Sequence, residues 1–214
     1  MRKDFNRIWS FGFVSGNKYW LCWCINKDNP LGEVSIWIKN GKNNFIFTNL
    51  GPDIIWLGRT YTTSCFTKAL NLDEKTEKLV WVSPIGYRNP NKKGLINYFS
   101  KRKRNDWNKK FFFEKPSMPM TEEKCSFFKK EVIGAIRWLP TAVNKQDYVV
   151  VFKDKTAHVF SVCSSMCYLC DGGIGITHVK IGCLGNGLNG HWEKLKEVFE
   201  DLPQNWKYFA SFIY

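Results

Sequence analysis

Apolar residues fall in short runs along this chain, separated by polar and glycine-containing stretches. Runs of this length that are rich in β-branched and aromatic residues predict buried strands. Two of the runs are joined by Asp154-Lys155, which predicts a hairpin. The predicted strands are Trp20–Ile25, Leu79–Tyr87 (ending near Pro84–Gly86), Tyr148–Phe152, Ala157–Val162 and Trp206–Tyr214.

Helices are predicted where apolar residues recur at helical spacing and a polar residue can cap the first turn. Thr121, followed by two glutamates, begins a helix that runs to Trp138 and is ended by Pro140. No helical period extends over residues 31–48, because Asn, Lys and Gly interrupt it. Further helices are predicted from Thr62 or Thr63 through Leu70, from Asp171 through Leu184, and over Trp192–Phe199.

The composition is that of a folded domain of the α+β class. Hydrophobic residues make up 44% and aromatic residues 16% of the 214 residues, which is ample material for a core. We expect one domain with two halves, about 1–87 and 116–214, joined by a basic linker over 88–115. No apolar run has the length that spans a bilayer, and no secretory signal follows Met1, so the expected location is cytoplasmic.

The chain is strongly basic. It has 32 Lys and Arg against 19 Asp and Glu, a net charge of +13, which favours anionic partners such as nucleic acid, a membrane surface or a phosphorylated cofactor. The basic run Lys101–Arg104 has aromatic neighbours that could stack on bases. It matches no nucleic-acid-binding motif, however, and a solvated linker is the favoured interpretation.

Three of the eight cysteines form the pattern Cys163-x3-Cys167-x2-Cys170, which could hold a four-iron cluster. Only 44 residues follow Cys170, too few for the barrel of a radical enzyme. Buried free thiols are therefore the favoured interpretation of the cysteines. The three histidines lie outside zinc-binding spacings, so structural roles are expected for them.

The segment Leu139–Gln146 joins a predicted helix to a predicted strand. Pro140 ends the helix and leaves nearby backbone groups available to a ligand. Thr141, Asn144 and Gln146 add directional donors and acceptors, which suit the edge of a planar heterocycle such as a flavin. From this pattern alone, an ordinary helix–strand turn is the favoured interpretation.

This segment, Pro-Thr-Ala-Val-Asn-Lys-Gln, resembles the Pro-Ser-x-x-Asn-x-Gln segment of FMN-dependent nitroreductases. The whole chain is similar to the nitroreductase family in which a single chain holds two fused halves. Leu50–Tyr61 resembles that family's Leu-Gly-x-x-x-x-Trp-Leu-Gly-Gly-Thr-Phe turn, with Trp56-Leu57-Gly58 at its centre. Segments 11–20, 83–87 and 171–178 follow the family in the same order. The resemblance implies an α+β fold with a nitroreductase-like sheet flanked by helices.

The resemblance also implies a chemistry. FMN would be bound along one edge by Pro140, Thr141, Ala142, Asn144 and Gln146, and along the other by Leu57, Gly58 and Arg59. Hydride would pass from NAD(P)H to the flavin N5 and then to a nitro compound or quinone. The protein itself would supply position and electrostatics rather than a nucleophile.

The chain departs from the family in several places. The family's first helix, with an Arg-Arg-Ser-x-Arg-like run that binds the flavin phosphate, has no counterpart here, so the fold is expected to be incomplete at its N-terminus. Residues 33–47 lack the pattern of the helix expected there, Asp147-Tyr148-Val149 replaces Pro-Trp-Arg, and Arg59 replaces a glycine. The alternatives are a flavin-free family member that acts as a basic binding protein and an iron–sulfur protein.

Overall fold

The computed structural model of this chain describes residues 19–29, 32–55, 57, 61–87, 89, 91, 103–123, 125, 127–162 and 168–214. The chain divides into two compact units, Met1–Lys101 and Arg102–Tyr214. Each contains both helices and strands, as the α+β prediction requires. None of the helices in the described ranges combines the length and the apolar character needed to cross a membrane.

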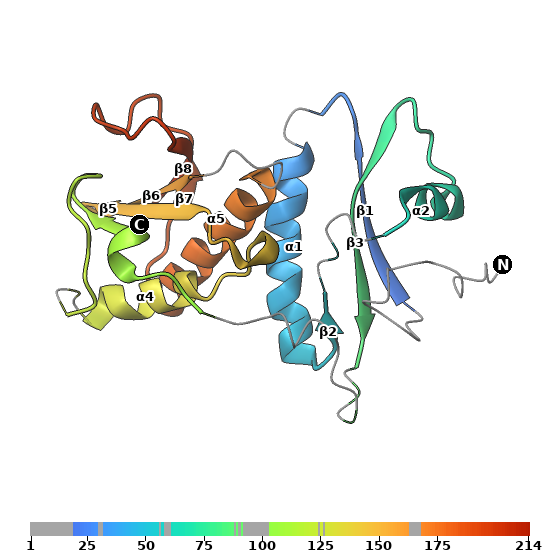
Figure 1. Ribbon diagram of the computed structural model, residues 1–214, viewed down its shortest axis with the longest axis horizontal. Coiled ribbons are helices and arrows are strands. Elements are labelled where there is room, and N and C mark those ends of the chain that lie inside the picture. The colour runs from blue at the N-terminus through green and yellow to red at the C-terminus, as the bar shows by residue number, and fades with distance from the viewer. Residues whose placement is uncertain are drawn as a thin grey trace. The chain divides into compact units, whose positions relative to one another are not determined.

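The first unit is built on a three-stranded antiparallel sheet in the order β1-β3-β2. The long strands β1 (Tyr19–Asn26) and β3 (Glu77–Gly86) confirm two predicted strands. The short strand β2 (Asp53–Ile54) pairs with the end of β3. In Figure 1 the helices α1 and α2 lie on opposite sides of this sheet.

Helix α2 (Thr63–Leu70) begins after Thr62, as predicted, although the Thr62 side chain makes no capping hydrogen bond. Its Phe66 is fully buried and meets the Trp20 ring of β1 edge-on, with the ring centroids 5.2 Å apart. The hydrophobic core of this side of the sheet contains Leu57, Tyr61, Phe66, Leu79 and Val82.

Helix α1 (Gly32–Leu50) corrects the interpretation of residues 31–48 as lacking a helix. Buried Ile36 and Trp37 lie on one face, and the Trp37 ring packs edge-on against Trp81 of β3 at 4.7 Å. Packing against the sheet therefore stabilises a helix that intrinsic propensity disfavours. The helix ends at Gly51, which adopts a φ of 99° and donates its N–H to the Phe47 carbonyl.

The second unit is built on a five-stranded sheet in the order β4-β5-β6-β8-β7. β4 runs parallel to β5, and the other pairs are antiparallel. The predicted hairpin is present, with Asp154 in the left-handed conformation at its turn. The predicted terminal strand is present as well. The strands are β4 (Phe111–Phe113), β5 (Tyr148–Lys153), β6 (Thr156–Ser161), β7 (His191–Glu193) and β8 (Lys207–Ile213).

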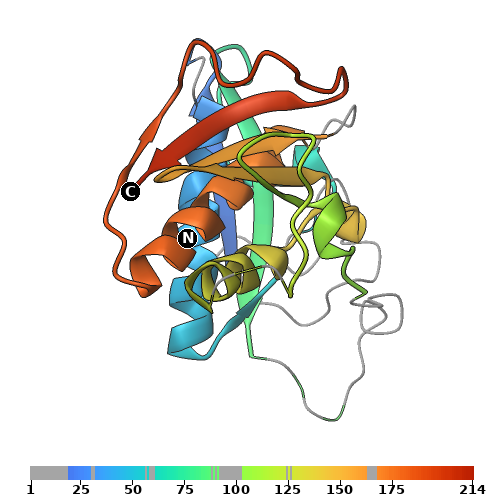
Figure 2. The same cartoon turned by 90° about the vertical axis from the view of Figure 1, so that its left-hand side faces the viewer.

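Helices α4 (Phe127–Arg137) and α5 (Tyr168–Gly185) pack against each other beneath one face of this sheet (Figure 2). The α5 helix covers the predicted segment after Asp171 and begins slightly earlier. The prediction that α4 begins at Thr121 is wrong. Residues 118–120 instead fold back onto β4, and the Thr121 hydroxyl has no hydrogen-bond partner among the described residues.

The opposite face of the sheet is covered by the irregular segment 194–206 between β7 and β8. The predicted helix over Trp192–Phe199 is therefore wrong: its first residues pair with β8, and its later apolar residues cover the sheet. These apolar residues are buried by contact with the sheet, and an irregular chain can make that contact as well as a helix can. The covered cluster is Phe112, Val149, Val151 and Phe160.

The second unit begins earlier than the predicted second half. The predicted linker 88–115 includes the 3₁₀ turn η2 (Trp107–Lys109) and the strand β4, both of which belong to the second unit. Trp107 and Phe111 are buried, and the Phe111 ring packs 6.3 Å from Tyr148 of β5. The apolar residues between the lysines thus pack part of the predicted linker, residues 107–113, into the core of the second unit.

Candidate functional site at the α4–β5 turn

The predicted flavin edge is a compact turn between α4 and β5. A 3₁₀ turn, η3 (Ala142–Asn144), follows the end of the helix. Asn144 and Gln146 both adopt left-handed backbone conformations, with φ values of 57° and 58°. The left-handed region is unusual for a glutamine, so tertiary contacts must fix the chain here. The structure places Pro140, Thr141, Ala142, Asn144 and Gln146 together in this turn.

Gln146 is the most deeply buried polar residue of the turn, with 3% of its surface exposed. Its Oε1 accepts a hydrogen bond from the backbone N–H of Asn105 at 2.9 Å. Its Nε2 donates to the carbonyls of Lys103, at 3.1 Å, and Asn144, at 3.3 Å. Its backbone N–H donates to Thr141 Oγ1 at 2.9 Å. Both ends of the amide are therefore satisfied within the chain.

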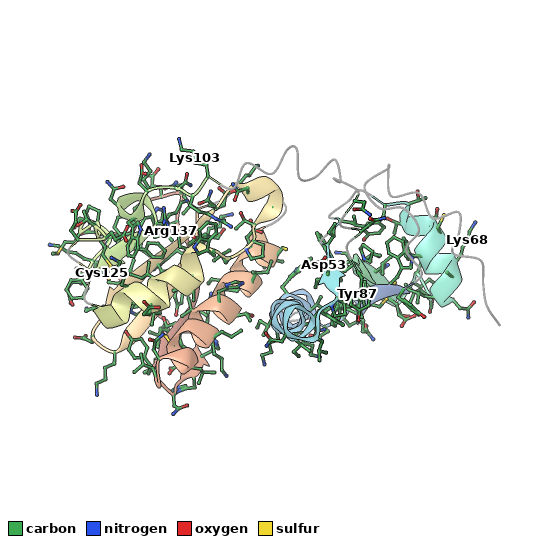
Figure 3. All side chains as sticks on the ribbon, turned by 90° about the horizontal axis from the view of Figure 1, so that it is seen from below. Asp53, Lys68, Tyr87, Lys103, Cys125 and Arg137 are labelled. Carbon is green, nitrogen blue, oxygen red and sulfur yellow. The ribbon has the colours of Figure 1, made fainter. Side chains whose placement is uncertain are left out.

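Asn144 makes a similar pair of contacts to the same partner segment. Its Oδ1 accepts from Arg104 Nη1 at 3.1 Å, and its Nδ2 donates to the Lys103 carbonyl at 3.1 Å. We call residues 103–105 the strap, because they run across the turn and are held by these two amides. Lys103 and Arg137, the last residue of α4, are labelled in Figure 3.

Arg104 joins the strap to the end of α4. Its guanidinium donates to the carbonyls of Leu139, at 3.1 Å, and Trp138, at 3.3 Å, and lies over the Trp138 ring at 5.1 Å. A cation at this end of a helix interacts favourably with the helix dipole and satisfies carbonyls that lack helical partners. Arg104 thus stabilises both the helix end and the turn.

Asp171, in the first turn of α5, also holds the turn in place. Its side chain is buried, and Oδ1 accepts a hydrogen bond from the Ala142 N–H at 3.1 Å. Burial raises the pKa of Asp171 to about 6, although the Ala142 hydrogen bond opposes that shift. The resemblance covers Asp171 but assigns it no such contact.

Two more polar side chains are buried beside the turn. The Lys110 ammonium donates to the Gln146 carbonyl, and burial lowers the pKa of Lys110. The Tyr148 hydroxyl donates to the Arg137 carbonyl at 3.4 Å, and burial raises the pKa of Tyr148. These contacts tie the turn to η2 and to β5.

The other predicted flavin edge belongs to the first unit. Leu57 is 4% exposed and is part of that unit's hydrophobic core. Gly58 and Arg59 lie outside the described residues. The residues that the structure brings together are those of the turn, the strap and Asp171.

The cysteines and histidines form no second site in the described part of the chain. No group of three metal-binding side chains occurs among the described residues. Cys170 is buried in α5, whereas Cys163 and Cys167 lie outside the described residues. Nδ1 of His158 bonds Ser211 Oγ at 2.7 Å, and Nδ1 of His178 bonds the Ala135 carbonyl at 3.1 Å.

The strap decides whether the turn can accept a flavin. The side-chain amides of Asn144 and Gln146, the Thr141 hydroxyl and the Ala142 N–H all have partners inside the second unit. With the strap in place, these groups do not fit the polar edge of a flavin. Arg104 and Asn105 could not be assigned to the site from sequence, because the basic run looks like a linker and local pattern does not disclose contacts to residues about forty positions away.

Comparison with known proteins supports the fold. No protein-family model and no curated protein sequence matches this chain. A crystal structure of a "putative nitroreductase" from Thermotoga maritima matches with a TM-score of 0.57 and 14% sequence identity. The match covers 94% of this chain and 77% of that one. The chain therefore has an α+β, nitroreductase-like fold, as its sequence predicts.

Proposed function

We propose that this protein is an FMN-dependent NAD(P)H oxidoreductase that reduces nitro compounds or quinones. The observation that carries the proposal is a nitroreductase-like fold over 94% of the chain, combined with the Pro140–Gln146 turn at the start of β5. The fold alone suggests an oxidoreductase. The motif in the turn points to flavin as its cofactor.

In this proposal the flavin edge comprises Pro140, Thr141, Ala142, Asn144 and Gln146 of the second unit. Bound FMN would supply the hydride-transfer chemistry, and the protein would orient it. The backbone of the turn is held rigidly by η3, Asp171 and the buried Gln146, and its side-chain amides would meet the flavin once residues 103–105 are displaced.

The test is the visible spectrum of the full chain purified without added flavin, repeated after incubation with FMN and gel filtration. If the proposal is right, the spectrum of the protein will show the two absorption bands of oxidised flavin, and denaturation will release FMN. The proposal also expects bleaching by NADH or NADPH and return of colour with a quinone. A released chromophore other than FMN, or a brown iron-containing protein, would contradict it.

A second candidate function is a flavin-free basic binding protein. The observation that favours it is that both side-chain amides, of Asn144 and Gln146, are hydrogen-bonded to the strap, in a chain of net charge +13. This candidate expects a colourless protein that retains no FMN after gel filtration. It also expects retention on an anionic resin that weakens steeply with salt.

A further inference from the structure

We propose that the strap is a displaceable occupant of the flavin edge, so that docking of residues 103–105 and binding of FMN at Asn144 and Gln146 exclude each other. This inference rests on the proposed function, since it concerns regulation of the same site. Its starting observation is that the hydrogen-bonding groups assigned to the flavin are occupied by the chain's own backbone.

The contacts made by the strap have the chemical pattern of a ligand edge. The Lys103 carbonyl accepts from Gln146 Nε2, and the Asn105 N–H donates to Gln146 Oε1. A carbonyl beside an N–H is also what the pyrimidine edge of a flavin presents to a protein amide. The same Gln146 side chain can therefore satisfy either the strap or a flavin, and one amide cannot serve both.

Burial of Gln146 makes this competition strict. With the strap docked, Gln146 is 3% exposed and its amide is hydrogen-bonded to Lys103 and Asn105, so a flavin cannot reach that amide until the strap has left. The polar groups of the strap itself can hydrogen-bond to water once residues 103–105 have left the turn. Lys103 is exposed, and Arg104 and Asn105 are only half-buried. Displacement therefore leaves no polar group of the strap buried without a hydrogen-bond partner.

Arg104 sets how firmly the strap is docked, because its guanidinium contacts Asn144, Leu139 and Trp138. If FMN binds only when the strap has left, the apparent Kd equals the intrinsic Kd divided by the fraction of undocked protein. A weaker strap should therefore tighten flavin binding. A residue that simply contacts FMN would have the opposite effect when removed.

The experiment compares FMN affinity, measured by flavin fluorescence, for the full-length wild type, Arg104→Ala and Lys103→Gln. Arg104→Ala should bind FMN about tenfold more tightly than the wild type. Lys103→Gln is the matched control, because it also removes one positive charge but retains the carbonyl through which Lys103 contacts the turn. Its affinity should be unchanged or slightly weaker.

Limited trypsin digestion of the wild type gives a second measurement that needs no variant. Saturating FMN should speed cleavage after Lys103 and Arg104 several-fold, since the displaced strap is open to the protease. Slower or unchanged cleavage in FMN-bound protein, or weaker binding by Arg104→Ala, would overturn the exclusion while leaving the proposed function intact. Failure of both wild type and Arg104→Ala to bind FMN would overturn the proposed function as well. Binding by Arg104→Ala alone would support the exclusion strongly.

Discussion

The Ala142 N–H donates to the buried carboxyl group of Asp171, which joins the α4–β5 turn to the first turn of α5. The pKa of Asp171 rises from 3.8 to about 6 on folding, mainly through burial. As pH rises from about 4 to 6, the unfolded chain releases this proton first. Folding stability should therefore fall over this window, by at most about 3 kcal/mol from this group.

Asp171→Asn should remove that contribution. An asparagine oxygen can still accept the Ala142 N–H, but the amide carries no charge to desolvate. We expect the variant to match or exceed the wild type in stability at pH 8 and to lose the part of the pH dependence due to Asp171. Urea unfolding at a series of pH values measures both. A variant clearly less stable at pH 8 would indicate that ionised Asp171 is stabilised by neighbouring cations.

The two buried histidines should make folding stability rise with pH, opposite to the effect of Asp171. Burial is the largest cause that lowers the pKa of His158 and of His178 from 6.5 to about 4. The unfolded chain therefore takes up protons first as pH falls from about 6.5 to 4, and stability is lost over that window. Two histidines outweigh one aspartate, so the net stability of the wild type should rise with pH over this range.

His158→Asn offers a direct check of this acid sensitivity, because the Asn side chain can still bond Ser211 Oγ. The variant should lose less stability than the wild type between pH 6.5 and pH 4.5 in thermal unfolding. His191→Asn is the control, since His191 is exposed in the edge strand β7. An equal change in both variants would place the acid sensitivity outside His158.

Close packing of α4 and α5 predicts opposite effects for two glycines. A Cβ at Gly182 would lie 3.1 Å from the Val132 carbonyl oxygen and 3.2 Å from the Ala135 Cβ, so Gly182→Ala should cost about 1–3 kcal/mol. A Cβ at Gly134 would meet nothing within 4 Å, so Gly134→Ala should stabilise by about 0.5–1 kcal/mol through helix propensity. Chemical denaturation of both variants tests this difference, and equal effects would contradict the close approach of the helices.

Lys110 should contribute more to stability than its neighbour Lys109. Lys110→Met removes the buried ammonium that serves the Gln146 carbonyl, which should cost about 1–3 kcal/mol. Lys109→Met removes only an exposed ion pair with Asp106 and should cost less than about 1 kcal/mol. The two variants have the same change in charge and side chain, so the difference between their unfolding midpoints isolates the buried contact. Equal midpoints would contradict it.

Local pattern predicted the five long strands, β1, β3, β5, β6 and β8, because their apolar runs are continuous and bounded by turn residues, but it missed the short strands β2, β4 and β7. It failed where tertiary contacts decide the structure. The α1 helix depends on contacts such as Trp37 with Trp81, which no helical period in its Asn- and Lys-rich sequence reveals. The 194–206 segment has apolar residues that cover a sheet without forming a helix.

Only part of the candidate site could be found from the sequence, because some of its contacts depend on tertiary structure. The motif Pro140–Gln146 is contiguous, so its residues could be found from sequence, and the structure places them in one turn. Arg104 and Asn105 reach that turn from a distant part of the chain, where they look like linker residues. A short motif identifies a turn, but the partners of its side chains depend on the fold.

The parallel pairing of β4 with β5 has a consequence for aggregation. Phe111–Phe113 covers the outer edge of β5, whose sequence Tyr-Val-Val-Val-Phe-Lys is buried for most of its length. A fragment cut at the predicted linker boundary, beginning at residue 116, would lose β4 and expose that apolar strand edge to other molecules. Unprotected edges of this kind recruit further strands from neighbouring chains. Strand β4 thus also protects the second unit against self-association.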